Sequence, residues 1–278
     1  MKNLIQKSKK ISTKLPLIRI KSIKSNSHNF GDIKNHKIGI GEEFWDYRDY
    51  VPGDSLKKID WKKSSKFSKL FIKNNENQNS KNIWFWINNS VSMNYRFSKK
   101  TERKIERAQI IGLILIDIFL RSGEKVGIIG SDLGLQNGKN KLISLASNFV
   151  ESSFHLFDSR IKKGDIVFII SDFIENPKNL REKLLNLSEN FYSAILIQVL
   201  DPSELNFPFK GRNRFFDPVS GLHKLFNRSE NMKNIFRKKI LLHQKKIKYM
   251  CDKFGWKVFT NQTNETYESL ILKIYNYL

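Results

Sequence analysis

The chain is poor in cysteine and has no long apolar segment. Its single cysteine, Cys251, excludes an internal disulfide and a cysteine-rich metal site, which is typical of proteins in a reducing compartment. The longest apolar run, residues 110–120, contains Asp117 and is shorter than the roughly 20 residues that a membrane-spanning helix needs. The basic N-terminus lacks the continuous apolar core of a signal peptide. We therefore expect a cytoplasmic protein.

The chain also lacks the usual sequence signatures of enzymes. It has no G-x-S-x-G nucleophile elbow, no phosphate-binding loop and no G-x-G-x-x-G motif. Its five histidines do not show the spacing of metal ligands. Cys251 follows Ile247 by four residues in a basic helical pattern, where a buried structural role is the commoner one. These absences predict a protein that is not an enzyme.

Acidic residues are scarce relative to basic ones. Fifty Lys and Arg against 27 Asp and Glu give a formal net charge of +23, a field that attracts polyanions. Lysine far outnumbers arginine, and Asn and Ile are frequent, a joint bias that is typical of an AT-rich coding sequence. A nucleic-acid-binding protein is expected to gather arginine and aromatic residues on one face, whereas these lysines are scattered. Charge therefore makes nucleic-acid binding, or peripheral contact with an anionic membrane, the alternative function.

Apolar strand patterns alternate with helical patterns over most of the chain. Strands that are apolar throughout and separated by helices are typical of a parallel sheet covered on both faces. We predict an α/β fold with a mostly parallel central sheet over residues 81–278, preceded by an N-terminal extension. The predicted strands are residues 70–72, 83–87, 126–129, 165–171, 194–200 and 256–260. The predicted helices are residues 101–121 (capped by Thr101), 141–150, 177–188, 228–254 and 265–278. A loop is expected over residues 201–212 and a hairpin turn at residues 217–221.

Residues 1–34 are predicted to form a basic N-terminal arm. Residues 1–24 carry eight basic side chains and no acidic one, with apolar residues between them. One interpretation is an amphipathic arm that lies on anionic lipid or RNA. The other, which we favour, is a terminal helix or loose arm whose apolar side docks on the domain, because Pro16 interrupts the helical period.

Residues 35–80 differ in composition from the rest of the chain. Between Gly41 and Asp60, six acidic residues outnumber three basic ones, although the whole chain is strongly basic. A Pro-Gly-Asp turn signal lies in this segment, with aromatic residues on both sides. The segment can present carboxylates and aromatic rings to a partner, or it can form an ion-paired turn region that packs on the main domain. The residues that we single out are Glu42, Trp45, Arg48, Tyr50, Pro52, Gly53, Asp54, Asp60 and Trp61.

Small polar residues follow two of the predicted strands. Asn88, Ser90 and Ser92 lie directly after residues 83–87, and Asp172 follows residues 165–171. Because the carboxyl ends of parallel strands meet at one edge of a sheet, we expect these four side chains to lie near one another. Open α/β sheets bind their ligands at such an edge. The sequence therefore predicts a metal or partner site there.

Several motifs, in one order, resemble a known family. The polar loop after residues 83–87 and the later strand that ends in Ser-Asp resemble the von Willebrand factor A-like domain. The run G-E-E-F-W-D-Y-R-D-Y-V-P-G-D of residues 41–54, followed by I-D-W-K-K-S-S-K of residues 59–66, resembles the signature of the domain of unknown function 58 family. The resemblance covers residues 35–278 and is to compact bacterial members without transmembrane helices. Further matches are I-I-S-D-F at residues 169–173, D-P-S-E-L-N-F-P-F-K-G-R at residues 201–212 and Gly-Trp at residues 255–256.

The resemblance implies a von Willebrand A-like fold and no established enzymatic activity. It also implies a chaperone-like interaction or assembly factor that works with a MoxR-type AAA+ ATPase on a client protein. In A-type domains the edge loop holds Mg²⁺ through hydroxyls and carboxylates. Ser90, Ser92 and Asp172 match such positions, but Asn88 replaces the first aspartate and the loop threonine is missing. We therefore predict a degenerate metal site and no required cofactor, with Mg²⁺ as the ion that a retained site would bind.

Overall fold

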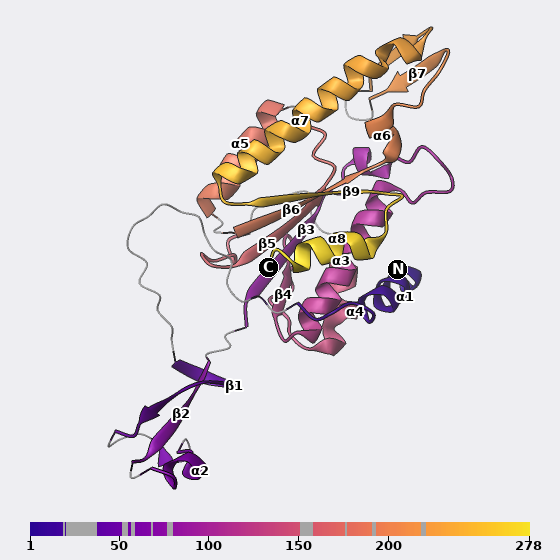
Figure 1. Cartoon of the computed structure of the whole chain (residues 1–278). Coiled ribbons are helices and arrows are strands. Elements are labelled where there is room, and N and C mark those ends of the chain that lie inside the picture. The colour runs from indigo at the N-terminus through magenta and orange to yellow at the C-terminus, as the bar shows by residue number, and fades with distance from the viewer. Residues whose placement is uncertain are drawn as a thin grey trace. The chain divides into compact units, whose positions relative to one another are not determined.

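The computed structural model describes residues 1–18, 20, 38–51, 55–56, 59–67, 69–76, 80–150, 158–175, 177–190, 193–217 and 221–278. The chain divides into two units (Figure 1). The larger unit is Met1–Asn26 with Lys81–Leu278, and the smaller one is Ser27–Ser80. None of the helices in the described ranges combines the length and the apolar character that crossing a membrane requires.

A five-stranded sheet forms the centre of the larger unit. All neighbouring strands in it pair in parallel, so the predicted parallel sheet is confirmed. From one edge to the other its strands are β4 (Lys125–Ile128), β3 (Asn82–Ile87), β5 (Ile166–Ser171), β6 (Ser193–Leu200) and β9 (Lys257–Gln262).

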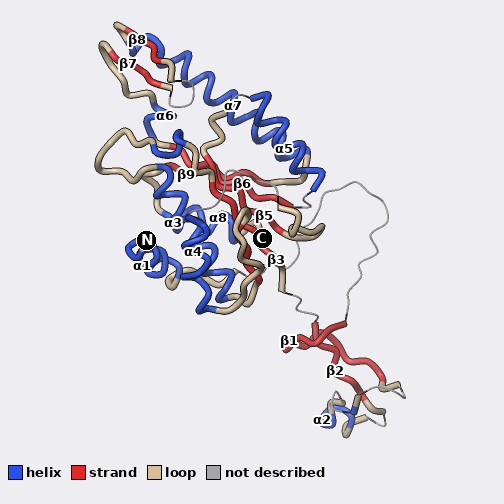
Figure 2. The backbone as a smooth tube through the Cα atoms, turned by 180° about the vertical axis from the view of Figure 1, so that it is seen from behind, coloured by secondary structure: helices blue, strands red, loops and turns tan. Residues whose placement is uncertain are grey.

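Helices cover both faces of this sheet, as predicted for the α/β class (Figures 1 and 2). One face carries α1 (Lys2–Ser12), α3 (Lys104–Arg121), α4 (Leu142–Val150) and α8 (Tyr267–Tyr275). The opposite face carries α5 (Pro177–Asn190) and α7 (Lys233–Lys253).

Alternation along the strands divides the apolar side chains between two cores. Successive side chains of a strand point to opposite faces of the sheet. Phe85 and Phe168 accordingly stack at 4.9 Å between ring centroids in the core under α3, whereas Trp84 lies in the core under α5 and α7. Gly112 lets α4 approach α3 closely, because a Cβ there would lie 2.3 Å from the ring of Phe149.

The start of α3 differs from the prediction. The helix begins at Lys104 after Arg103, so the expected cap at Thr101 is wrong. The Lys104 amide donates to the Tyr95 carbonyl oxygen at 3.1 Å, and the Glu106 carboxylate accepts from the Arg103 amide at 3.0 Å. The residues before Lys104 are therefore bonded into a loop that lies near the carboxyl end of the sheet.

The N-terminal helix α1 packs against α3. The Ser12 hydroxyl donates to the Asp117 carboxylate at 2.6 Å, and Arg121 joins them by donating to Asp117 at 2.9 Å and to the Ser12 carbonyl oxygen at 2.6 Å. Leu4, Ile5 and Ile11 pack on the core of this face. Asp117, the one charged residue inside the longest apolar run, thus anchors α1.

Some elements differ in extent from the predictions. The loop expected over residues 201–212 contains a short helix, α6 (Pro202–Asn206), and α7 begins five residues later than expected, after a 3-10 turn. Strands β7 (Asn213–Phe216) and β8 (His223–Phe226) pair antiparallel, as the predicted hairpin requires, and residues 218–220 of its turn lie outside the described residues.

The smaller unit is built on an antiparallel pair of strands. Strand β1 (Ile38–Asp49) pairs with β2 (Phe71–Glu76), and α2 (Trp61–Ser64) lies between them in sequence. Only residues 70–72 of this pair were predicted to form a strand. The long β1 was missed because its Gly and charged residues interrupt the apolar alternation that marks a strand.

Candidate functional site

The carboxyl edge of the parallel sheet contains a topological switch point. From β3 the chain passes through α3 to β4 on one side, and then crosses to β5 on the other side of β3. Ligands of open α/β sheets bind outside the strand ends at such a point. The loop after β3 and the end of β5 meet there, where the Asn88 amide donates to the Ile170 carbonyl oxygen at 2.9 Å.

Three of the four predicted metal ligands bond to groups of the edge itself. The Asn88 side-chain amide donates to the Ser171 hydroxyl at 3.0 Å, and its carbonyl oxygen accepts from the Ser90 amide at 3.0 Å. The hydroxyls of Ser90 and Ser92 share a hydrogen bond of 2.9 Å. The loop thus satisfies its own polar groups.

Asp172, the fourth predicted ligand, is paired with a lysine. The Lys104 ammonium donates to Asp172 Oδ2 and to Glu204 Oε1, each at 2.8 Å. The side chains of Lys104 and Asp172 are both 1% exposed, and that of Glu204 is 15% exposed. The positive charge next to Asp172 therefore belongs to the first residue of α3.

The two carboxylates determine the charge state of this lysine. Burial by itself lowers the pKa of Lys104, but the opposite charges of Asp172 and Glu204 outweigh burial and raise it above its ordinary value. Burial raises the pKa of Glu204, and the Lys104 charge opposes that rise. The ammonium is thus held in its charged form inside the protein.

The short helix α6 holds Glu204 in place. Asp201 caps this helix by accepting from the Ser203 amide at 2.9 Å, and Glu204 accepts in return from the Asp201 amide at 2.7 Å. Asp201 also accepts from the Phe97 amide at 3.1 Å, and the Tyr95 hydroxyl bonds the Ser203 hydroxyl at 2.9 Å. These bonds tie α6 to the loop before α3 and hold the Glu204 carboxylate beside Lys104.

A divalent cation does not fit this arrangement. Mg²⁺ and Ca²⁺ require several oxygen ligands with a surplus of negative charge. Both carboxylate oxygens of Asp172 already accept hydrogen bonds, Oδ2 from the Lys104 ammonium at 2.8 Å and Oδ1 from the Ile174 amide at 3.3 Å. Within the described ranges, no group of three or more His, Cys, Asp or Glu side chains is arranged to hold a metal.

Sequence reasoning missed Lys104 and Glu204. In the sequence Lys104 is one residue of the predicted helix 101–121, and its position in the first turn of a mostly apolar helix is the one feature that could indicate a buried charge. Glu204 stands three residues after Asp201, which is the spacing of a capping box. Neither feature predicts which side chain pairs with Lys104, because Lys104 and its two carboxylates are far apart in the sequence.

The signature segment places its residues in and after β1. Asp60 caps α2 by accepting from the Lys63 amide at 3.0 Å, and it also accepts from the Tyr47 hydroxyl at 3.0 Å. This hydrogen bond to Asp60 raises the pKa of Tyr47. Trp61, the first residue of α2, is exposed. The packing of residues 35–80 on the main domain stays a prediction.

The other seven singled-out residues belong to β1 or to the stretch of sequence that follows it. The Tyr50 amide donates to the Leu70 carbonyl oxygen at 2.8 Å just after β1. Pro52, Gly53 and Asp54 lie outside the described residues. The remaining three, Glu42, Trp45 and Arg48, are part of strand β1.

Two solved structures have a weak likeness to the chain. No curated protein matches the chain. A solved structure of the conserved hypothetical protein BatB from Bacteroides thetaiotaomicron has 15% sequence identity and a TM-score of 0.36, over 71% of this chain and 97% of that one. An aerotolerance-related membrane protein from Bacteroides fragilis has 14% identity and a TM-score of 0.32, over 72% and 100%. Likeness at this level establishes neither fold nor function.

The sequence model of one family covers most of the chain. It is described as "Protein of unknown function DUF58" and matches residues 46–246, which include the second half of the signature segment and all the residues of the switch-point site. The predicted family is thereby confirmed. The chain belongs to the DUF58 family, the domain of unknown function 58 proteins.

Proposed function

We propose that the chain is a non-enzymatic protein-interaction module that acts at the carboxyl edge of its parallel sheet. The observation that supports this function is the closed ion-pair cluster of Lys104, Asp172 and Glu204. The Lys104 ammonium bonds both carboxylates, which leaves one net negative charge, and each of the three groups is engaged with another one. We therefore assign the cluster a structural role and no role as an acid, a base or a metal ligand. A site built in this way is a rigid support for a surface.

The rim of this edge offers apolar side chains for contact. Val91 lies in the turn that follows the Asn88 loop, and Phe97 lies in the segment that Asp201 holds. Both side chains are more than half exposed. The Phe97 ring contacts Phe209 at 5.3 Å between centroids, which limits its freedom. Rigid exposed aromatic residues are enriched in protein interfaces, which favours a protein partner.

The partner that we propose is a MoxR-type AAA+ ATPase, together with an unidentified client protein. This part of the proposal rests on analogy with the family, and a shared fold does not by itself determine function. The expected role is assistance in the maturation or assembly of the client.

A binding experiment with a matched control tests the edge. The MoxR-type ATPase from the same genome is titrated with the full-length chain and with V91S/F97S, with I143S as the control for an exposed apolar residue on α4. We expect the edge variant to lose at least about tenfold in affinity, as for central interface residues. Equal affinity of the wild type and V91S/F97S, or no binding at all, would contradict the proposal.

We further propose that this edge works without a divalent ion. Calorimetric titration of the purified chain with Mg²⁺ and with Mn²⁺ is expected to show no stoichiometric binding, because the Lys104 ammonium competes for Asp172. Stoichiometric heat that disappears in S90A/S92A would show that the metal site is retained.

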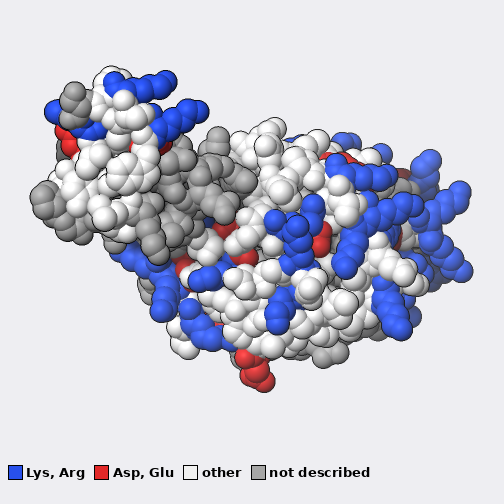
Figure 3. Space-filling model, turned by 90° about the horizontal axis from the view of Figure 1, so that it is seen from below, with Lys and Arg blue, Asp and Glu red and all other residues white. Residues whose placement is uncertain are grey.

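The alternative function, binding of nucleic acid or anionic membrane, rests on charge. Figure 3 shows a face on which Lys and Arg outnumber Asp and Glu and are spread over the surface. Polyanion binding weakens steeply with salt, since counterions are released. Retention of DNA, RNA or anionic vesicles at physiological salt would support this alternative, and its absence would reject it.

A further inference from the structure

Helix α7 has an apolar stripe on the side opposite to the core. Its inward face buries Ile240, Ile247 and Cys251. On the outward face Ile235, Leu242 and Tyr249 are 50%, 50% and 61% exposed. These three residues are each seven positions apart, and seven residues of an α-helix return to within about 20° of the same direction. They therefore form one straight apolar line along the outer side of the helix.

Basic side chains border this line on both sides. The helix carries eight Lys and Arg residues and one acidic residue, Asp252. In the part of the chain that the structure describes, none of these basic groups forms an ion pair with an acid. Lys238 and Lys245 follow one side of the line at a spacing of seven, and Lys239, Lys246 and Lys253 follow the other side at the same spacing.

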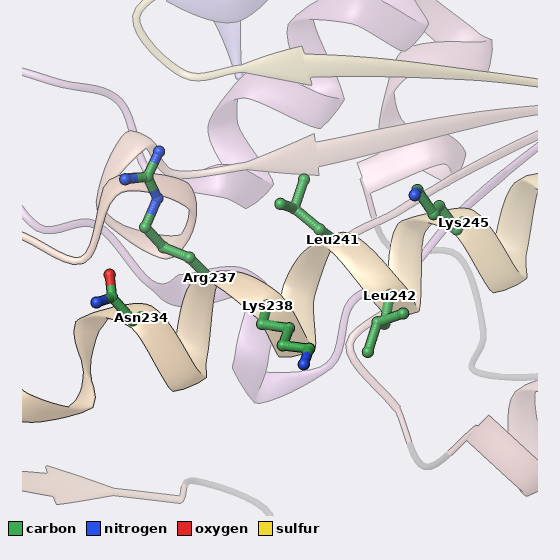
Figure 4. Close-up of a pocket in the computed structure, with 6 residues that line it drawn as sticks. All are labelled: Asn234, Arg237, Lys238, Leu241, Leu242 and Lys245. Atoms are coloured by element: carbon green, nitrogen blue, oxygen red, sulfur yellow. The ribbon is translucent and has the colours of Figure 1, made fainter.

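A surface pocket lies along the same helix. Its lining consists of six α7 residues, and Figure 4 shows Leu242 and Lys238 pointing to the same side. Leu241, also exposed, lies about 100° around the helix from Leu242, beyond Lys238 and Lys245, and points away from it in Figure 4. The pocket lining thus combines two leucines with three cationic side chains. The six residues are Asn234, Arg237, Lys238, Leu241, Leu242 and Lys245.

We propose that the outward face of α7 docks an acidic amphipathic helix of a partner protein. A second helix fits a line of apolar residues with a period of seven, because its own apolar residues then meet that line along its length. Charges that flank such a line select the partner, so flanking Asp and Glu on the incoming helix would pair with the lysines on both sides. The 21 residues of α7 provide a contact about 30 Å long.

Other occupants fit this face less well. A helix that lies on a membrane needs a broad apolar face, whereas Lys238, Lys245 and Lys246 stand next to the line here. A nucleic acid binds basic groups through its phosphates, and this contact does not require apolar residues at a spacing of seven. A second copy of α7 would bring two basic faces together and repel. The face is separate from the switch-point edge, so the docking proposal does not depend on the proposed function.

A designed peptide tests this proposal. The probe is a fluorescent 21-residue helical peptide with Leu at heptad positions and Glu beside them, and its control is a scrambled peptide of identical composition. Both are titrated with the full-length chain at about 0.15 M salt. We expect the heptad peptide to bind and the scrambled one to bind at least about tenfold more weakly, because apolar register adds to the charge attraction.

Variants of the chain separate apolar docking from general charge attraction. L242S/Y249S is expected to weaken binding of the heptad peptide about tenfold, whereas L272S, at an exposed leucine of α8 on the opposite face, leaves it unchanged. K238E/K245E should also lose binding, and a peptide with Lys in place of Glu only on the flank that faces residues 238 and 245 should restore it. Thermal unfolding confirms that each variant is folded.

Three outcomes would overturn the proposal. The first is no binding of the heptad peptide up to about 0.1 mM, which corresponds to a free energy weaker than roughly −5.5 kcal/mol. The second is equal binding of the heptad and scrambled peptides. The third is tighter binding of duplex DNA or of phosphatidylserine vesicles than of the peptide, lost in K238E/K245E but not in L242S/Y249S.

Discussion

Replacing Lys104 by methionine should strongly destabilise the protein. Methionine keeps the length of the side chain but removes the ammonium that bonds Asp172 and Glu204 at 2.8 Å. Both carboxylates stay buried, at 1% and 15% side-chain exposure, and lose their counter-charge. Removing one partner of a buried ion pair costs about 3–5 kcal/mol. We therefore expect K104M to lose about 3–5 kcal/mol of unfolding free energy at pH 7.

The loss should depend on pH in a defined direction. In the wild type the pKa of Lys104 is raised, so its contribution is fully present below the ordinary lysine value and is lost only as the pH rises through the folded-state pKa. Burial raises the pKa of Glu204, and K104M removes the Lys104 charge that opposes this rise, so the penalty for ionising Glu204 grows as the pH rises above about 4. The deficit of K104M relative to the wild type should therefore be smaller at pH 5 than at pH 7.

Urea unfolding followed by tryptophan fluorescence measures this deficit. Trp84 and Trp86 are buried in β3 and report on the sheet. A shift of the midpoint with an unchanged slope is a change in stability. The control is K100M, at an exposed lysine in the loop before α3. A K104M deficit below about 1 kcal/mol, or an equal deficit at pH 5 and pH 7, would refute our account of the cluster.

Two further predictions concern single groups. The thiol of Cys251 is buried, and burial raises its pKa to about 12. We therefore expect the thiol to resist disulfide reagents in the native protein and to react with them in urea. Rapid reaction without urea would contradict its burial. The pKa of Asp158 is lowered by its hydrogen bond to Arg160, so it stabilises the protein above about pH 4 and loses that effect as the pH falls. In urea unfolding at pH 6, D158N should therefore be less stable than the wild type by about 1 kcal/mol or less, because Arg160 is partly exposed. Near pH 3 the two proteins should be equally stable. A constant difference at both pH values would argue against the ion pair.

The sequence alone was sufficient to predict the sheet and the family. Runs such as residues 165–171 are apolar at every position, and only a strand covered on both faces buries such a run. The order of the signature motifs pointed to the family that the matched residues confirm. The buried position of Cys251 also followed from its helical spacing to Ile247. All three are local patterns, and a local pattern keeps its meaning without knowledge of the fold.

The sequence also located the edge of the sheet without identifying its chemistry. Asn88 and Asp172 were expected to meet there, and the end of β3 does bond the end of β5. Their predicted roles as metal ligands came from the resemblance to A-type domains. Such a resemblance compares residues at matching positions of the motif and does not show which side chains from other segments lie beside them. The tertiary structure supplies one such side chain, the Lys104 ammonium, at Asp172.

Only the tertiary structure decided which groups meet. Lys104 pairs with Glu204 across 100 positions of the chain, and Ser12 bonds Asp117 across 105. The lysines and apolar residues of α7 are visible in the sequence, but which side of that helix faces solvent depends on its packing against the sheet. Helical and strand periods are set by neighbours along the chain, whereas ion pairs and exposed faces are set by strand order and helix packing, which bring distant segments together.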